Sequence, residues 1–322
     1  MSPGPRNYKT GMAGTEIFDR PYIGRFAPSP TGKLHFGSMV AAVGSYLQAR
    51  SMGGIWRVRI EDLDPPREVA GAAAQQLETL ARFGMKPDGP VEKQSQLTRR
   101  YQRALDRLVL KEQAFGCCCT RKDLPDSGVY PGTCRDGTPT DRPPRSIRFR
   151  VTDEEICFAD GIQGVQRQQP AGQCGDFVIR RADGLFAYQL AVVVDDGEAG
   201  VTEVVRGADL IDSTARQILL QRALRLRQPD YAHLPLIVDA RGHKLSKSRG
   251  DDPIDRLPCA DALRLVLRAL GHEPPRGMRS LESQWHWAVR NWDLIKVPRG
   301  PISVAVKGDG DYTDQSTASE QV

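Results

Sequence analysis

A strand–turn–helix pattern near the N-terminus places the strongest constraint on the fold. Residues 22–26 form a short apolar run, and the turn-rich sequence Ala-Pro-Ser-Pro-Thr-Gly follows at once. Apolar residues then recur at helical spacing, which predicts a helix over about 37–50. A second strand is predicted over 55–60, and this order is typical of a parallel sheet with crossover helices.

The alternation continues along the chain and predicts an α/β fold with a Rossmann-like parallel sheet. Further helices are expected at 69–83, 97–114, 213–226, 260–270 and 281–294. Further strands are expected at 177–180, 185–194, 201–205 and 234–238. Because residues 116–152 are rich in Cys, Pro and Gly and show little periodicity, an insertion is predicted to split the α/β domain.

Six segments follow from this division. They are a flexible lead (1–20), a first half of the catalytic domain (21–115), a Cys-rich insertion that we predict to bind zinc (116–175), a second half (176–240), a lysine-containing loop with a short helical C-terminal region (241–298), and a disordered tail (299–322).

Composition excludes some classes of protein. No stretch approaches the roughly 18 consecutive apolar residues of a membrane span, and the first 15 residues lack the apolar core of a secretory signal. We therefore expect a cytoplasmic protein without membrane contact. The net charge of +5 permits contact with RNA but does not require it. The odd number of cysteines, seven, does not suggest a disulfide framework.

The first strand–helix junction has the features of a nucleotide site. A helix N-terminus at the carboxyl end of a parallel strand attracts phosphate. His35 can donate a hydrogen bond to a phosphate oxygen, and Gly37 allows a nucleotide to approach the backbone closely. Taken alone, this stretch also fits an ordinary Pro/Gly turn before an amphipathic helix.

A second candidate element is the sequence Lys244-Leu245-Ser246-Lys247-Ser248, which follows a predicted strand. Its two lysines, three residues apart, can reach the same triphosphate and neutralise charge as pyrophosphate leaves. A solvated basic loop is the alternative for this pentapeptide in isolation.

Together these elements resemble the two ATP-binding motifs of class I aminoacyl-tRNA synthetases. Residues 25–38, Arg-Phe-Ala-Pro-Ser-Pro-Thr-Gly-Lys-Leu-His-Phe-Gly-Ser, are similar to the glutamyl/glutaminyl branch, and the similarity extends through 59–64, 186–196 and 205–210. The resemblance implies a class I synthetase fold and ATP as substrate with Mg²⁺. The catalytic residues that it implies are His35, Lys244 and Lys247, and the implied ATP contacts are Pro28, Ser29, His35, Gly37, Ser38, Lys244, Ser246 and Lys247.

An acidic amino acid requires a cation for its side-chain carboxylate and an acid for its ammonium group. Arginine suits the first task because its planar fork binds a carboxylate in a bidentate way. By resemblance to the family, the glutamate contacts are Arg25, Phe26, Ala27, Pro28, Ser29, Glu61, Tyr188 and Arg206. The alternative is that Glu61 and Arg206 pair with each other as buried charges.

Four cysteines lie in the Pro/Gly-rich stretch 116–152, where bound zinc could hold a segment without an apolar core. Compact relatives of glutamyl-tRNA synthetase carry a Cys-x-Cys, Tyr, x₃-Cys zinc site. The resemblance implies one Zn²⁺ per chain on Cys117, Cys119, Tyr130 and Cys134. Cys118 departs from the pattern as an extra thiol that could replace a neighbour. The alternative is that these are reduced cysteines packed as small hydrophobic side chains.

Chain length bears on the acceptor. Only 74 residues follow Ser248, too few for an anticodon-reading domain of about 100 residues. The chain therefore resembles the truncated glutamyl-queuosine tRNA(Asp) synthetases, which implies tRNA-independent activation of L-glutamate and its transfer to queuosine in tRNA(Asp). We expect a monomer. The alternatives are a minimal enzyme that charges the 3′ end of tRNA(Glu), an inactive RNA-binding paralogue, and a pantothenate-synthetase-like ligase, whose pattern lacks the Arg-Phe-Ala-Pro-Ser and Cys-rich segments.

Overall fold

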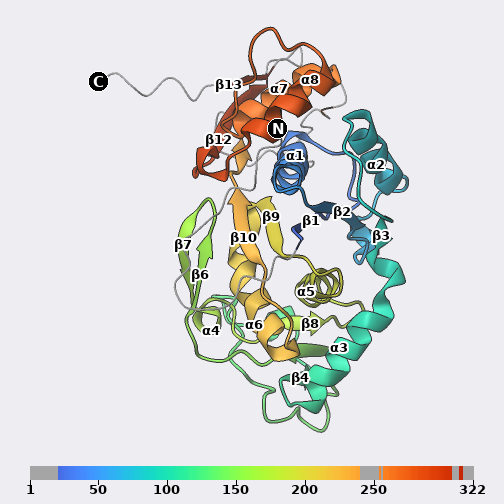
Figure 1. The fold of residues 1–322 in the computed structure, drawn as a ribbon. Helices are drawn as coiled ribbons and strands as arrows, with labels where there is room; N and C mark the ends of the chain where they lie inside the picture. Colours follow the sequence, from blue (N-terminus) through green and yellow to red (C-terminus); the bar gives the residue numbers. More distant parts are fainter. Residues whose placement is uncertain (1–20, 240–253, 255–256, 307–311, 315–322) are drawn as a thin grey trace.

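The fold is given by a computed structural model that describes residues 21–239, 254, 257–306 and 312–314 (Figure 1). The predicted lead, residues 1–20, lies outside this part. Within the described residues, no helix has both the length and the apolar character needed to cross a bilayer.

The N-terminal half is a parallel unit. Strand β1 (Ile23–Phe26) is followed by helix α1 (Phe36–Ser51) and strand β2 (Ile55–Ile60), and β2 pairs with β1 in parallel. A short strand, β3 (Glu92–Lys93), continues the sheet in the order β1-β2-β3. The predicted strand–helix–strand unit is thus confirmed. Helices α2 (Ala72–Arg82) and α3 (Thr98–Leu110) are also where the periodicity predicts them.

The second sheet has the order β7-β6-β10-β9. Strand β10 (Asp230–Leu234) runs parallel to β9 (Glu203–Gly207) and to β6 (Ile156–Asp160), whereas β7 (Gly164–Gln168) is antiparallel to β6. Strands β6 and β7 therefore extend the sheet of β9 and β10, although in sequence they belong to the predicted insertion (116–175).

Backbone contacts join the two sheets at β1 and β9. The Ile23 carbonyl accepts from the Thr202 backbone N–H at 2.9 Å, and the Thr202 hydroxyl accepts from the Ile23 N–H at 2.9 Å. Segments nearly 180 residues apart in sequence therefore lie side by side.

One predicted strand is wrong. Residues 185–194 were expected to be a strand, but Tyr188–Glu198 is helix α5. Every residue from Gln189 to Asp196 is buried, so this helix has no polar face in its central turns to reveal a 3.6-residue period. Without that period, a continuous apolar run rich in valine predicts a strand.

The other predicted helices are confirmed. They are α6 (Thr214–Leu224), α7 (Cys259–Ala269) and α8 (Leu281–Asn291), and a short helix α4 (Pro170–Gln173) is added. Single 3₁₀ turns or short 3₁₀ helices occur at Pro65–Arg67, Gln94–Gln96, Arg121–Asp123, Ala208–Ser213 and Leu294–Lys296.

The C-terminal strands differ from expectation. The strand expected over 234–238 is interrupted, because β10 ends at Leu234 and β11 is Ile237–Val238. Pro235 lies in the gap and has no N–H for a sheet ladder. Strand β12 (Ile302–Val306) pairs in parallel with β11 and antiparallel with β13 (Tyr312–Asp314). The expectation of a disordered tail is therefore wrong for these two strands.

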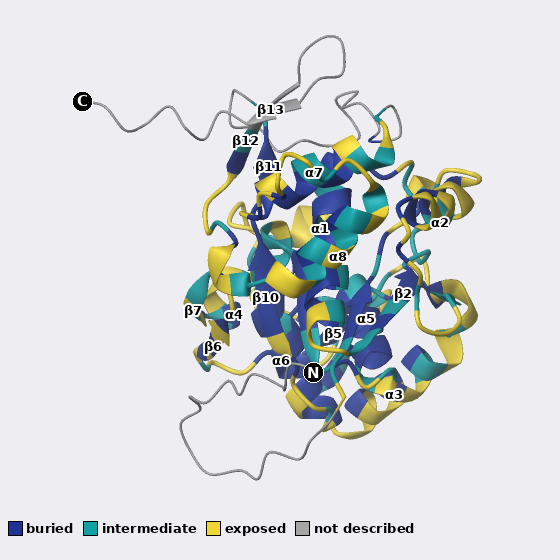
Figure 2. Cartoon of the chain, turned by 45° about the horizontal axis from the view of Figure 1, so that its top comes forward, coloured by how far each residue is buried: buried dark blue, intermediate teal, exposed yellow. Residues whose placement is uncertain are grey.

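Two apolar cores stabilise the fold (Figure 2). One packs α1 against the helices of the C-terminal region and includes Leu47, Trp56 and Leu263. The other packs α3, α5 and α6 together and includes Tyr101, Leu190 and Ile218. Beside the Cys-rich segment, β4 (Ala114–Cys117), β5 (Ser146–Phe149) and β8 (Val178–Arg180) form a further sheet of three strands.

Candidate active site

A cavity of about 1100 Å³ opens where β1, β2 and β9 end. Every described residue that the sequence predicts for the nucleotide and glutamate sites lines it, namely Arg25, Phe26, Ala27, Pro28, Ser29, His35, Gly37, Ser38, Glu61, Tyr188 and Arg206. Lys244, Ser246 and Lys247 lie outside the described residues. Pro235, Leu236 and Ile237, which precede them in the chain, also line the cavity.

The N-terminus of α1 forms one end of the cavity. His35 is the N-cap of this helix, and its Nδ1 accepts from the Ser38 backbone N–H at 3.3 Å. Because Nδ1 is the acceptor, the proton of the neutral imidazole is on Nε2. A Cβ atom at Gly37 would lie 3.2 Å from the His35 ring. The glycine therefore leaves room for this ring, a reason for its presence that the sequence did not indicate.

Helix α2 holds the loop that precedes His35. The fully buried side chain of Gln76 donates to the carbonyls of Ser29, at 3.0 Å, and Gly32, at 2.6 Å. Gly32 has φ of 129°, a conformation that favours glycine. Sequence reasoning missed Gln76, since a single glutamine within an amphipathic helix carries no functional signal.

At the other end of the cavity, charges form a buried network around Asp196. The Arg25 Nε atom donates to Asp196 Oδ2 at 3.2 Å, and Arg59 Nη1 donates to Asp196 Oδ1 at 2.7 Å. Arg59 also pairs with Glu61, with 3.3 Å between Nη2 and Oε1. Burial acts to raise the pKa of Asp196, but the two guanidinium groups hold it below its usual value. Asp196 is therefore a carboxylate that fixes both arginines.

The preceding residue, Asp195, extends this network away from the cavity. Its Oδ2 accepts from the Gln94 amide and from the Tyr101 hydroxyl, both at 2.8 Å. The sequence resemblance included Asp195 and Asp196 but gave them no role. Their position on the last turn of helix α5, rather than on a strand, brings both carboxylates to Arg59.

Arg206 has a different environment. Its guanidinium donates to neutral acceptors on four residues, which are Leu210 O at 3.2 Å, Thr214 Oγ1 at 2.9 Å, Gln217 Oε1 at 2.8 Å and His233 Nε2 at 3.0 Å. Within the described part of the chain, no acidic side chain accepts from it, and Glu61 pairs with Arg59 instead. The alternative of a structural Glu61–Arg206 pair is therefore not what the fold contains.

The pKa shifts of Glu61 and Tyr188 indicate which charges surround them. Burial raises the pKa of Glu61, and Arg59 and Arg25 oppose this. Burial also raises the pKa of Tyr188; Arg206 lowers it and Glu61 raises it. The Tyr188 hydroxyl therefore keeps its proton and lies in the field of both Glu61 and Arg206. A ligand with one positive and one negative end fits this arrangement.

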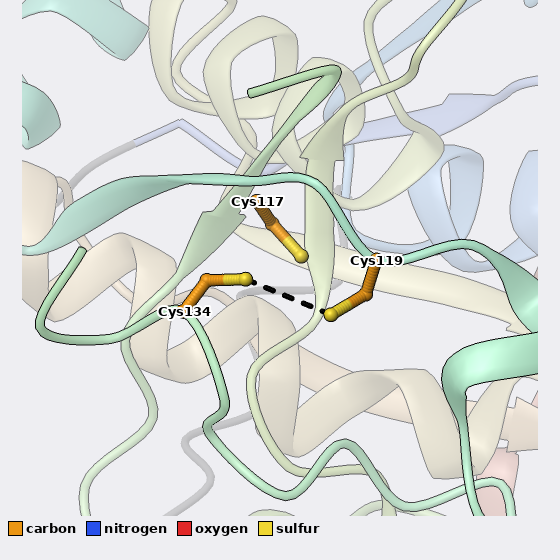
Figure 3. Close-up of side chains that lie close together, drawn as sticks. All are labelled: Cys117, Cys119 and Cys134. Atoms are coloured by element: carbon orange, nitrogen blue, oxygen red, sulfur yellow. Dashed lines mark hydrogen bonds between the residues drawn. The ribbon is translucent and has the colours of Figure 1, made fainter. Parts of the chain in front are cut away.

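The Cys-rich segment forms a second candidate site (Figure 3). The sulfur atoms of Cys117, Cys119 and Cys134 point toward one another and all lie within 4.8 Å of each other. Cys119 and Cys134 are 3.6 Å apart. Cys118 Sγ is 3.7 Å from Cys134 Sγ but does not belong to this group of three.

These distances fit a tetrahedral metal ion. Two thiolates bound to zinc at about 2.3 Å would be separated by about 3.8 Å, close to the Cys119–Cys134 separation. Burial raises the pKa of Cys119 to about 12. Burial also acts to raise that of Cys134, but hydrogen bonds, that of Tyr130 first, bring it to about 6. The cluster can therefore hold a metal ion.

Tyr130 lies against the same cluster. Its hydroxyl is 3.5 Å from Cys117 Sγ and accepts from the Cys134 backbone N–H at 2.8 Å. The Arg148 guanidinium lies 3.9 Å from the centre of the Tyr130 ring and donates to Cys117 Sγ at 3.2 Å. Burial raises the pKa of Tyr130. All four predicted ligands therefore lie together, with a cation beside one thiol.

Comparison with known proteins identifies relatives along almost the whole described chain. Residues 23–127 and 134–268 match the family described as tRNA synthetases class I (E and Q), catalytic domain. A glutamyl-Q tRNA(Asp) synthetase of Chromobacterium violaceum is 52% identical over 290 residues, which are 88% of this chain and 97% of that protein. One from Pseudomonas aeruginosa is 51% identical over 281 residues, 86% of this chain and 96% of that protein.

A solved structure has a similar fold. It is a glutamate tRNA ligase from Elizabethkingia meningosepticum in complex with its amino acid. The TM-score is 0.75 at 27% identity, and the match covers 88% of this chain and 67% of that one.

Proposed function

The chain belongs to the class I tRNA synthetases of the glutamyl-Q tRNA(Asp) type and is a ligase, and from this premise we propose that it activates L-glutamate with ATP in the absence of tRNA and transfers it to queuosine in tRNA(Asp). The proposal rests on one cavity that contains Arg206, Glu61 and the N-terminus of α1. Among the described residues, the hydrogen-bond partners of Arg206 are all neutral.

Glutamate would bind through its two charged ends. Arg206 receives the side-chain carboxylate, because no acid of the described chain neutralises its charge and Nη1 has one N–H beyond the one donated to Gln217. Glu61 receives the ammonium group, whose charge would bring the pKa of Glu61 back down. The Tyr188 hydroxyl donates to the side chain, and Arg25 is held near the pocket by Asp196. Phe26, Ala27, Pro28 and Ser29 form the wall between the two ends.

The nucleotide would bind at the N-terminus of α1. The Nε2–H of His35 faces the triphosphate as a donor, because Nδ1 is occupied by the Ser38 N–H. The α-carboxylate attacks the α-phosphorus, the bond to the β-phosphate oxygen breaks, and pyrophosphate leaves as glutamyl-adenylate forms. Lys244 and Lys247, with Mg²⁺, neutralise charge on the leaving pyrophosphate, and Ser246 contacts the nucleotide.

In the second step, a hydroxyl of the cyclopentenediol of queuosine attacks the carbonyl carbon of the adenylate. An ester forms, the attacking hydroxyl releases its proton, and AMP leaves with the electrons of the broken carbonyl–oxygen bond. The names of the relatives support this acceptor. We also propose that the chain acts as a cytoplasmic monomer.

A zinc ion would stabilise the Cys-rich segment. Cys117, Cys119 and Cys134 would hold it by thiolate sulfur and Tyr130 by its hydroxyl, with a structural rather than a chemical role.

The test is glutamate-dependent ATP–pyrophosphate exchange without RNA, followed by transfer of labelled glutamate to purified tRNAs. We expect exchange without tRNA, and label on tRNA(Asp) only when it carries queuosine. Label on tRNA(Glu) would indicate the minimal enzyme that charges the 3′ end. No exchange with any amino acid would indicate an inactive RNA-binding paralogue, and either result contradicts the proposal.

A further inference from the structure

The neutral partners of Arg206 include one side chain that the proposed chemistry does not use. His233 is fully buried on β10 and pairs with Arg206 in the register of β9 and β10. Its Nε2 lies 3.0 Å from Arg206 Nε. Since the guanidinium can only donate, this imidazole nitrogen must be the acceptor.

The other imidazole nitrogen contacts a buried acid. His233 Nδ1 is 2.5 Å from Asp160 Oδ2, at the end of β6. The second oxygen, Oδ1, accepts from three backbone N–H groups, those of Ile162 at 3.0 Å, Gln163 at 2.8 Å and His233 at 3.1 Å. Asp160 is therefore fixed by the backbone of the β6–β7 turn and of strand β10, and its remaining oxygen faces the imidazole.

These contacts determine where the imidazole proton lies. With Nε2 accepting from Arg206, the proton is on Nδ1 and is donated to Asp160. Burial and the charge of Arg206 lower the pKa of His233, while Asp160 opposes them, which is consistent with a neutral ring. A neutral histidine aligns the guanidinium without placing a carboxylate against it. Arg206 thus keeps its positive charge available for a ligand.

We propose that Asp160 and His233 are positioning residues that hold Arg206 in the orientation required to bind the side-chain carboxylate of the substrate. This inference rests on the proposed function, because it deepens the role given there to Arg206. Strands β6, β10 and β9 are adjacent, so the three side chains form a line across the sheet toward the cavity.

The variant Asp160→Asn tests the proton arrangement with little loss of structure. Asn keeps an oxygen for the three backbone donors but presents an amide N–H₂ to His233 Nδ1. The imidazole must then accept at Nδ1 and carry its proton on Nε2, where it opposes the Arg206 Nε–H. We expect the KM for glutamate in ATP–pyrophosphate exchange to rise about tenfold or more, with a smaller change in kcat. An unchanged KM would overturn the proposal.

Two substitutions at His233 separate its contacts, should Asp160→Asn fail to fold. His233→Gln extends far enough to place an amide oxygen near the Nε2 position and accept from Arg206. His233→Asn reaches only the Nδ1 position and leaves Arg206 without this acceptor. We expect the glutamate KM to rise more in His233→Asn than in His233→Gln. Equal values, or the reverse order, would contradict a positioning role.

Tyr231→Phe is the matched control. The Tyr231 ring stacks on His233 with centroids 6.1 Å apart, and its hydroxyl bonds to Gln221 at 3.0 Å. The variant removes a buried hydrogen bond from β10 but keeps the stacked ring, so we expect an unchanged glutamate KM. A rise equal to that of Asp160→Asn would indicate a general loss of packing and would contradict the proposal.

Nitrogen-15 NMR of the imidazoles gives a readout that does not depend on activity. The chain has five histidines, so His233 can be assigned by comparison with His233→Gln. We expect an Nδ1–H tautomer in the native protein and an Nε2–H tautomer in Asp160→Asn. If the native protein has this tautomer but shows no exchange, the proposed function fails while the proton arrangement stands. An Nε2–H tautomer in the native protein would overturn the inference itself.

Discussion

The cavity and the cysteine cluster both place reactive groups away from water, but different contacts hold those groups in the two sites. Beside the cavity, Asp196 lies between Arg25 and Arg59, and α5 and the sheet hold all three side chains in place. In the cysteine cluster, thiols contact mainly each other and Tyr130. The charges beside the cavity are paired within the protein, whereas the thiol cluster would be completed by the metal ion that we propose.

The apolar surroundings explain this difference. Helix α5 is part of a core that includes Leu190 and Ile218, so the position of Asp196 is determined by packing over many residues. The buried group around the cluster consists of Cys117, Cys118, Tyr130 and Cys134. A segment with so little buried apolar surface would be stabilised by the metal ion that we propose for it.

The largest expected effect comes from a substitution in the buried charge network beside the cavity. Asp196→Asn removes the charge shared by Arg25 and Arg59, both of which are nearly fully buried. We expect a loss of about 3–5 kcal/mol in the free energy of unfolding, because Arg25 loses its ion-pair partner while buried, and Arg59 keeps only Glu61 and Asp195. Urea unfolding measures it. Glu154→Gln breaks an exposed pair with Arg222 and should cost about 1 kcal/mol or less. Equal losses would mean that the buried network is not what stabilises the cavity.

A second variant tests Arg206, the cation that we propose binds the side-chain carboxylate of the substrate. Arg206→Ala removes the proposed partner of the glutamate carboxylate, and we expect kcat/KM for glutamate in ATP–pyrophosphate exchange to fall about 100-fold or more. Arg222→Ala, at an exposed arginine of α6, is the control and should keep full activity. Exchange that continues unchanged in Arg206→Ala would remove this residue from the pocket.

A third pair of variants sharpens the contrast at the cysteine cluster. Cys134→Ser removes a member of the group of three thiols, whereas Cys118→Ser removes a thiol outside it. We expect zinc in Cys134→Ser to fall below about 0.3 per chain and its free energy of unfolding to drop by about 2 kcal/mol. Metal analysis should find zinc retained in Cys118→Ser. The opposite order would show that Cys118 is a ligand, and a metal-free native protein would favour packed, reduced cysteines.

The smallest expected effect concerns Glu203, a carboxylate that has no ion-pair partner among the described residues. Burial raises the pKa of Glu203 to about 7, while its hydrogen bond from Gln48 lowers it and Asp230 raises it. Between the unfolded value and this one, the folded state binds the extra proton, so this contribution to stability decreases as pH rises toward 7. Because the side chain is partly exposed, we expect Glu203→Gln to stabilise the protein at pH 8 by about 1 kcal/mol. Thermal melts should show no gain near pH 4.5, and an equal gain at both pH values would contradict this cause.

Much of the fold could be predicted from local pattern. The 3.6-residue period predicted α1, α3 and α8, and the short apolar runs predicted β1 and β2, because each of these elements has an exposed face or lies beside a turn. The same reasoning failed for α5, since a helix buried on every side shows no period. It also failed for β12, whose pairing with β11 depends on a partner more than 60 residues away.

Sequence by itself determined which residue types line the cavity, since the motif around His35, together with Glu61 and Arg206, can be identified in the sequence alone. Tertiary structure alone decided how these groups are charged and oriented. Asp196 fixes Arg25, Gln76 fixes the loop before His35, and His233 accepts from Arg206, each across a distance in sequence that no local pattern spans. Electrostatic and hydrogen-bond partners are set by proximity in space, and only the packed sheet and helices bring them together.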